Sequence, residues 1–160
     1  MSKPEIIIEP NSQEIRINTT YNAPRELVFK AYTDPDLIPQ WWGPRDLTTE
    51  VDKLDARPGG QWRFLNRDAE GNVYAFRGVF HDVVPSDRIV QTFEWEGMPG
   101  HVTLETAVFE DLGGGKTRVA AQSVFQSIED RDGMVASGME VGVNEGFERM
   151  NELLMSLQKA

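Results

Sequence analysis

The sequence predicts an α+β domain in which an antiparallel sheet is followed by one long C-terminal helix. Two observations lead to this prediction. Strand-like runs between residues 14 and 125 are separated by short turn-forming segments, as in a meander of antiparallel strands. Near the C-terminus the apolar residues change to intervals of three and four, which is the spacing of an amphipathic helix.

The first predicted strand of this domain covers residues 14–21. Ile15, Ile17 and Tyr21 fall on one side of it, and such alternation is typical of a strand with one buried face. We expect one domain to extend from this strand over residues 14–160, because a chain of 160 residues is within the usual range of a single domain.

Residues 1–13 are expected to form an N-terminal extension of this domain. The most apolar part of the extension is Ile6-Ile7-Ile8, and the sequence leaves three interpretations of it open. These interpretations are an additional edge strand, a contact in a homodimer and a mobile tail.

Two short helices are predicted after the first strand. Pro24 suits the first position of a helix, and Glu26 then lies near the positive N-terminal end of the helix dipole. Asp34-Pro35 repeats this device for the second helix, as a capping residue followed by proline. That helix ends near Trp41-Trp42-Gly43-Pro44, here called the tryptophan corner, because its glycine and proline do not extend a helix.

Six further strands are predicted after these helices, which makes a sheet of about six or seven strands. Glycine, proline and aspartate mark the turns between them. The expected strand ranges are 46–56, 60–67, 73–84, 87–96, 101–111 and 116–125.

The long C-terminal helix is predicted from one apolar face. Its members are Val135, Met139, Val143, Phe147, Met150, Leu153, Leu154 and Leu157. Ser127 and Asp130 form a capping pair for a short turn before it, and a break is expected between Gly133 and Gly138.

Three glycines recur every four residues on this helix, at Gly138, Gly142 and Gly146. An internal glycine weakens a helix by about 1 kcal/mol relative to alanine, so a row of them requires a reason. The row indicates either close packing against the sheet or space left free for a cavity, and we favour close packing.

The order of these motifs resembles the Hsp90-ATPase-activator-homologue-like branch of the START/Bet v 1-like superfamily, also called SRPBCC. The resemblance covers residues 14–158. Its motifs are Asn22-Ala23-Pro24, Val28-Phe29, Asp34-Pro35, the tryptophan corner, Arg57-Pro58-Gly59-Gly60, Arg77-Gly78-Val79-Phe80, Val84-Pro85 and Ser137-Gly138-Met139-Glu140. The resemblance implies a helix-grip fold, in which a curved antiparallel sheet wraps around the C-terminal helix and leaves a cavity between them.

Aromatic and apolar residues are the candidates for the wall of that cavity. Flat rings and flexible thioethers suit an apolar guest of irregular shape, although the same residues also suit a filled core. The candidates are Trp41, Trp42, Trp62, Phe64, Phe76, Phe80, Phe93, Trp95, Met139, Val143, Phe147 and Met150.

Two arginines lie on strands that are otherwise rich in apolar residues. Arg63 lies between Trp62 and Phe64, and Arg77 follows Phe76. Because successive side chains of a strand point to opposite faces, inward rings require both arginines to face outward.

Acidic residues offer a weaker signal for chemistry. A carboxyl that faces the cavity would have a raised pKa because burial disfavours its charged form. The candidates are Glu50, Asp52, Glu94, Glu105 and Glu140. The two histidines, His81 and His101, have no spacing that suggests a metal site, so we expect no metal and no cofactor.

Composition excludes several classes of partner. The net charge is −10 and the pI is about 4.6, which disfavours binding to nucleic acid. The sequence has no cysteine and no apolar run long enough to cross a membrane, so we expect a cytoplasmic protein without disulfides or membrane insertion.

Three functions remain open. The first is binding of a hydrophobic or amphipathic small molecule by a monomer or homodimer. The second is a polyketide cyclase-like or hydrolase-like enzyme acting on an aromatic substrate, although no nucleophile elbow, phosphate loop or dinucleotide motif is present. The third, implied by the resemblance alone, is association with an Hsp90-type chaperone; the activators it resembles carry a separate N-terminal domain for which this sequence has no equivalent.

Overall fold

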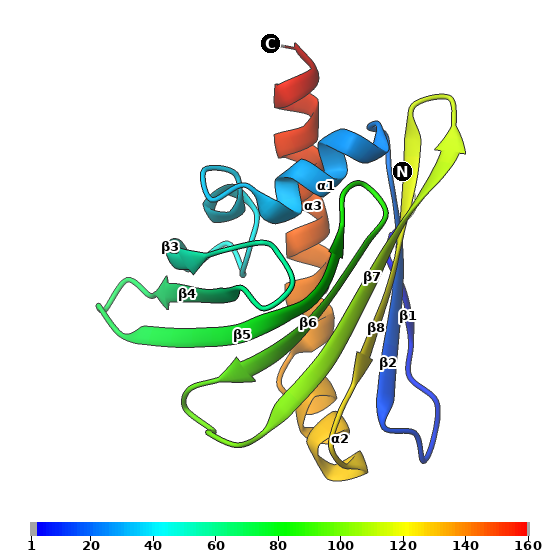
Figure 1. The fold of residues 1–160 in the computed structure, drawn as a ribbon. Helices are drawn as coiled ribbons and strands as arrows, with labels where there is room; N and C mark the ends of the chain where they lie inside the picture. The colour runs from blue at the N-terminus through cyan, green and yellow to red at the C-terminus, as the bar shows by residue number, and fades with distance from the viewer. Residues whose placement is uncertain (1–2, 160) are drawn as a thin grey trace.

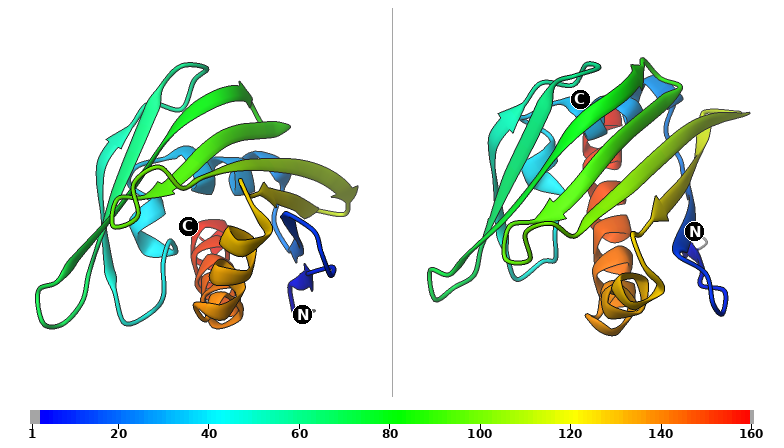
Figure 2. Two further views of the ribbon diagram at one scale, coloured as in Figure 1. Left: turned by 90° about the horizontal axis from the view of Figure 1, so that it is seen from below. Right: turned by 60° about the horizontal axis from the view of Figure 1, so that its bottom comes forward.

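A curved eight-stranded antiparallel sheet wraps around one long helix in the computed structural model, which describes residues 3–159 (Figure 1). The strand order is β1-β2-β8-β7-β6-β5-β4-β3, and every neighbouring pair is antiparallel. Figure 2 shows the C-terminal helix in the hollow of the sheet. The predicted α+β helix-grip fold is therefore confirmed, while residues 1, 2 and 160 of the predicted segments lie outside the described residues.

The strands follow the predicted ranges closely. They are β1 (Glu5–Ile7), β2 (Glu14–Tyr21), β3 (Thr48–Leu54), β4 (Gln61–Arg67), β5 (Val73–Val84), β6 (Arg88–Trp95), β7 (Val102–Gly113) and β8 (Lys116–Val124). The helices are α1 (Arg25–Thr33), the 3-10 helix η1 (Ile38–Gln40), α2 (Ile128–Ala136) and α3 (Met139–Lys159).

The eighth strand comes from the predicted N-terminal extension. β1 pairs with β2, and Ile6 lies opposite Ile17. Of the three interpretations of the isoleucine run, the structure shows the edge strand. The buried guanidinium of Arg131 on α2 holds this region, because its Nη1 donates to the carbonyls of Glu9 at 2.8 Å and Glu14 at 3.3 Å.

The two predicted helices after β2 differ in size. α1 begins one residue later than expected, since Pro24 is its N-cap and accepts hydrogen bonds from the amides of Leu27 and Val28. The second helix is only the three-residue η1. The Asp34 carboxylate accepts from the Asp36 amide at 2.8 Å, which stabilises the turn between them.

The break before the long helix lies where the sequence predicted it. Gly138 has a φ of +86°, a backbone conformation that glycine adopts without steric cost, and it separates α2 from α3. The predicted cap of α2 is also present, because Ser127 Oγ accepts from the Asp130 amide at 3.0 Å.

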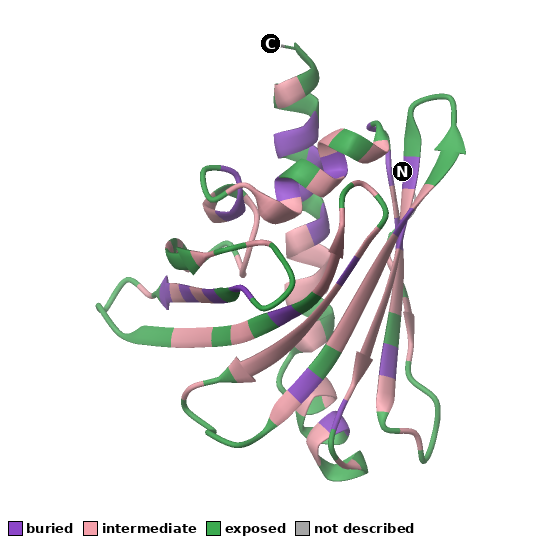
Figure 3. Cartoon of the chain, in the orientation of Figure 1, coloured by how far each residue is buried: buried purple, intermediate pink, exposed green. Residues whose placement is uncertain are grey.

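The hydrophobic core lies between the concave face of the sheet, α1 and α3. Figure 3 shows that buried segments concentrate on these elements, whereas loops and the outer strand ends are exposed. Val28 and Ala31 of α1 and Met150 of α3 are fully buried, and Phe109 of β7 packs against Phe29 of α1 with ring centroids 5.3 Å apart. The core is continuous with the cavity wall, because Trp62, Phe64 and Phe147 belong to both.

Gly78 of β5 lets the indole of Trp62 on β4 cross β5 and reach the backbone of β6. A Cβ at this position would lie 1.9 Å from the Thr92 carbonyl oxygen and 2.4 Å from Trp62 Nε1. The absence of a side chain lets Trp62 Nε1 donate to that carbonyl at 3.1 Å. The buried indole is thereby satisfied and fixed in place.

The arginines Arg63 and Arg77 face outward, as their alternation with rings predicted. Arg63 pairs with Glu96 through two hydrogen bonds of 2.6 and 3.0 Å, and Arg77 donates to Glu94 at 3.0 Å. Neither guanidinium is available to a cavity ligand. Among residues 3–159, no helix is both long and apolar enough to cross a membrane.

Candidate ligand cavity

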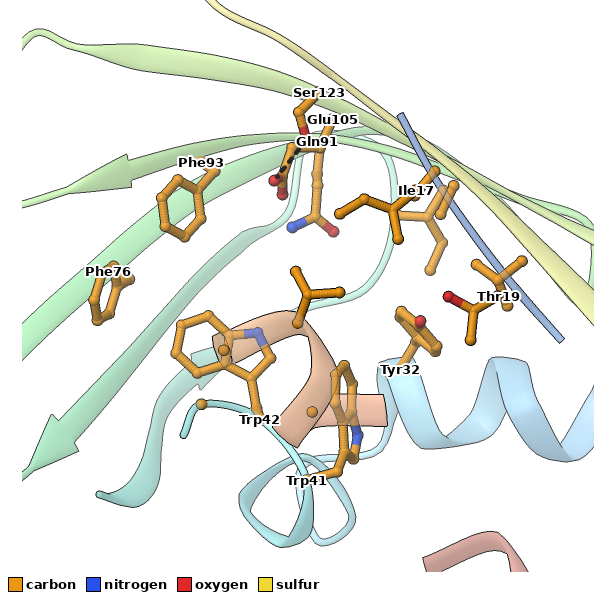
Figure 4. Close-up of a pocket in the computed structure, with 18 of the residues that line it drawn as sticks. Ile17, Thr19, Tyr32, Trp41, Trp42, Phe76, Gln91, Phe93, Glu105 and Ser123 are labelled. Atoms are coloured by element: carbon orange, nitrogen blue, oxygen red, sulfur yellow. Dashed lines mark hydrogen bonds between the residues drawn. The ribbon is translucent and has the colours of Figure 1, made fainter. Parts of the chain in front are cut away.

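A cavity of about 510 Å³ lies between the concave face of the sheet and α3. This volume is within the range of sites that take small organic ligands. Figure 4 shows its two sides, with aromatic rings along one part and polar side chains from the central strands along another.

The aromatic wall consists of contacting rings. Trp42 makes edge contacts with Phe64 at 5.1 Å and Phe76 at 5.4 Å, and Phe76 stacks against Phe93 at 5.5 Å. Trp62 belongs to the same wall, with its ring centroid 4.8 Å from that of Phe64. These separations are typical of stabilising aromatic pairs, so the wall is a packed surface.

The tryptophan corner, residues 41–44, closes one side of the cavity. Trp41 Nε1 donates to the Ala31 carbonyl at 2.9 Å and anchors the corner to α1. Arg149 of α3 anchors it from the other side, because Nη1 donates to the Gly43 carbonyl at 2.8 Å and Nη2 to the Pro39 carbonyl at 3.2 Å. Sequence reasoning missed Arg149, since its partners are backbone carbonyls that no side-chain pattern marks.

The glycines of α3 leave space. Gly142 and Gly146 line the cavity, and a Cβ at either position would have no heavy atom outside its own helix within 4 Å. Close packing against the sheet was therefore the wrong interpretation of these glycines. Because they lack side chains where α3 faces the sheet, they enlarge the cavity.

The polar part of the cavity centres on Glu105 in the N-terminal half of β7. Gln91 of β6 and Ser123 of β8 lie opposite Glu105 in the strand registers, so all three belong to the concave face. Ser123 Oγ donates to Glu105 Oε2 at a long distance of 3.4 Å. The remaining acceptor positions of this carboxyl have no described hydrogen-bond partner.

Two tyrosines extend the polar part. Tyr21 of β2 and Tyr32 of α1 both line the cavity. Burial raises the pKa of Tyr32 from 10.0 to about 12 and raises that of Tyr21 well above its ordinary value. Both phenols therefore remain protonated at neutral pH and serve as hydrogen-bonding groups.

Glu105 is the only acidic or basic side chain among the described residues that line the cavity, apart from the two phenols. Part of it remains accessible from the cavity, but burial among protein atoms raises its pKa from 4.5 to about 7. The hydrogen bond from Ser123 opposes this effect and is the smaller contribution. Glu105 thus changes its charge near neutral pH.

Glu105 was one of five acids that the sequence offered, and the structure separates it from the rest. Glu50, Asp52 and Glu140 are exposed, and Glu94 pairs with Arg77 on the outer face. The signal that distinguishes Glu105 is its inward register on β7. Within residues 3–159, no group of three histidine, cysteine, aspartate or glutamate side chains could hold a metal ion.

Ten of the twelve predicted cavity residues line the cavity. They are Trp41, Trp42, Trp62, Phe64, Phe76, Phe80, Phe93, Met139, Val143 and Phe147.

Trp95 and Met150 do not line the cavity, which corrects the prediction for both. Trp95 is the last residue of β6, is 38% exposed and packs on Gly97 of the following turn. Met150 lies in the core formed with α1, fully buried and farther along α3 than the cavity extends. Helical spacing predicted its face correctly but not where the cavity ends.

The sheet, the enclosed helix and the cavity between them define a helix-grip domain. The chain belongs to the family described as Activator of Hsp90 ATPase homolog 1-like protein, whose model matches residues 22–155. No curated protein matches the sequence.

Several solved structures share the fold. A protein of Rhodobacter sphaeroides is 23% identical with a TM-score of 0.88, and the alignment covers 97% of this chain and 99% of that one. A protein of Staphylococcus epidermidis is 26% identical with a TM-score of 0.80, covering 96% and 94%. DynU16, a protein of the dynemicin biosynthetic locus, is 19% identical with a TM-score of 0.69, covering 91% of this chain and 48% of DynU16.

Proposed function

We propose that this protein binds an amphipathic small molecule in the cavity between its sheet and α3. The observation that carries the proposal is a space of about 510 Å³ lined by aromatic rings on one part and by Glu105 on another. The apolar part of the ligand lies against Trp42, Phe76 and Phe93, and its polar group lies toward Glu105, Gln91 and Ser123.

Burial of apolar surface supplies the driving force. Each Å² removed from water contributes about 25 cal/mol, so a ligand with a hydrocarbon or aromatic body gains affinity from the wall without specific hydrogen bonds. The polar groups then determine orientation and selectivity. The helix-grip fold and membership of the Activator of Hsp90 ATPase homolog 1-like family are consistent with this use of the cavity.

The titration of Glu105 favours a second candidate function. A carboxyl with a pKa of about 7 is suited to accept and return a proton at neutral pH, as in general acid-base catalysis. The second candidate is therefore an enzyme that moves a proton on a bound aromatic substrate. Chemical change of a bound ligand that depends on Glu105 distinguishes it from simple binding.

Filling the cavity from α3 tests the proposed function. Gly142→Leu places a side chain into the cavity, whereas Gly133→Leu makes the same substitution on α2, away from it. We expect Nile red, a neutral apolar dye, to bind wild type and Gly133→Leu at one equivalent in a fluorescence titration. Gly142→Leu should weaken binding at least about tenfold, and equal binding by all three proteins contradicts the proposal.

A further inference from the structure

We propose that the ligand is a cationic amphiphile, an apolar molecule whose protonated amine pairs with Glu105. This inference rests on the proposed function and adds the chemical class of the ligand to it. Its basis is the position of one carboxyl beside a wall of aromatic rings, in a cavity whose described lining includes no basic side chain.

Among the described residues that line the cavity with Glu105, no side chain is cationic. β6 and β8 contribute the neutral Gln91 and Ser123, and the titratable groups that α1 and β2 contribute to the cavity are the phenols of Tyr32 and Tyr21. The described lining residues of α2 and α3 are also uncharged; they are Met134, Met139, Gly142, Val143, Gly146 and Phe147. A basic ligand would supply the charge partner that the described lining residues do not provide.

Unfilled hydrogen-bond positions point to a donor on the ligand. An ionised carboxylate accepts about four hydrogen bonds, and Glu105 receives one, the long bond from Ser123. A protonated amine carries up to three donors and forms charge-assisted hydrogen bonds, which are about twice as strong as neutral ones. An anionic ligand would meet repulsion from the same carboxylate.

The aromatic wall adds a second attraction for a cation. Figure 4 shows Glu105 and Gln91 directed toward the space that Phe93 and Trp42 also border. The negative face of an aromatic ring attracts an ammonium group. The net charge of −10 also favours the approach of cations over that of anions.

This pairing makes binding depend on pH in a defined direction. A cation requires the ionised form of Glu105, whose pKa in the free protein is about 7. The affinity for a cationic ligand should therefore fall about tenfold between pH 8 and pH 6. At the lower pH most protein molecules carry a proton on Glu105 and must release it before the ligand binds. An amine with a pKa above about 9 remains charged throughout.

Three probes with one apolar body and different head groups test the inference. Phenylbutylamine, phenylbutanol and phenylbutyrate are titrated calorimetrically into wild type, Glu105→Gln and the control Glu140→Gln, at pH 8 and pH 6. Glu140 is an exposed residue of α3 that does not line the cavity.

At pH 8 we expect wild type and Glu140→Gln to bind the amine at least about tenfold more tightly than the alcohol, and to lose about tenfold at pH 6. Glu105→Gln should lose both the preference and the pH dependence. If the alcohol or the acid binds as tightly as the amine, the ligand class is wrong and the cavity proposal stands. If none of the three binds, both proposals are overturned.

Discussion

Glu105 is the residue on which the chemistry of this cavity depends. It lies on β7 opposite Gln91 of β6 and Ser123 of β8, and this strand register directs its side chain to the concave face. Burial then makes ionisation costly, and no basic residue lining the described cavity offsets that cost. The neutral form of the Glu105 carboxyl therefore costs the fold less free energy. Its charged form is the one that can select a cationic ligand.

This residue gives stability a specific pH dependence. The folded-state pKa of about 7 lies above the ordinary value of 4.5, so the native state retains a proton that the unfolded state releases between these values. The contribution of Glu105 therefore falls as pH rises from 4.5 to 7 and is constant above that window. Its full size is on the order of 3 kcal/mol.

Glu105→Gln should remove this dependence. In urea denaturation at a series of pH values, the free energy of unfolding of the variant should increase relative to wild type by up to ~1.4 kcal/mol per pH unit within the window. Glu140→Gln, at an exposed position, should differ from wild type by a constant amount. A constant difference for Glu105→Gln as well would show that its carboxyl titrates normally.

Among the elements, α3 has two roles with opposite effects on its stability: it packs into the core and it borders the cavity. Its C-terminal part packs Met150, Leu153 and Leu154 into the core, while its N-terminal part leaves space at Gly142 and Gly146. The glycines that provide this space weaken the helix. The helix therefore loses some stability where it borders the cavity.

Replacement of two glycines by alanine should have opposite effects. Gly146→Ala should raise the free energy of unfolding by about 1 kcal/mol, because its Cβ enters open space and the helix gains propensity. Gly138→Ala should lower it by about 1 kcal/mol, because its φ of +86° disfavours any side chain. Thermal and urea unfolding measure both, and equal signs would contradict the assignment of their roles.

The contact between Arg149 and the tryptophan corner joins α3 to the chain that follows η1. Arg149→Met retains much of the apolar stem but removes the donors to the carbonyls of Pro39 and Gly43. We expect a loss of about 2 kcal/mol in the free energy of unfolding.

Arg57→Met provides the control, because it removes an exposed pair with Asp55 and should change stability by less than about 0.5 kcal/mol. Faster amide exchange at residues 41–44 should accompany the loss in Arg149→Met. Equal stability of the two variants would contradict an anchoring role for Arg149.

For the whole molecule, local patterns predicted the strands and helices, the family resemblance implied how the sheet wraps around the last helix, and long-range packing decided the site. Turn residues and alternation located the strands after residue 46, and the change to helical spacing located α3. The structure of the isoleucine run could not be decided from the sequence, because three isoleucines do not indicate which strand they pair with. Only the pairing with β2 distinguishes a strand from a tail.

The sequence was sufficient to predict the apolar residues that line the cavity. It was not sufficient to predict where the cavity ends. Alternation directed Phe64, Phe76 and Phe93 inward, but where the cavity ends depends on how α1 and α3 cover the sheet. The same long-range packing explains the exposure of Trp95 and the burial of Met150. Glu105 could be named as a candidate, but its selection required the register of three strands.

Native mass spectrometry of protein purified from cell extract shows directly whether the cavity holds a small molecule. We expect a stoichiometric adduct that is lost on denaturation, carries a basic nitrogen and is absent from Gly142→Leu purified in parallel. An adduct retained equally by Gly142→Leu, or no adduct on either protein, would contradict the proposed function.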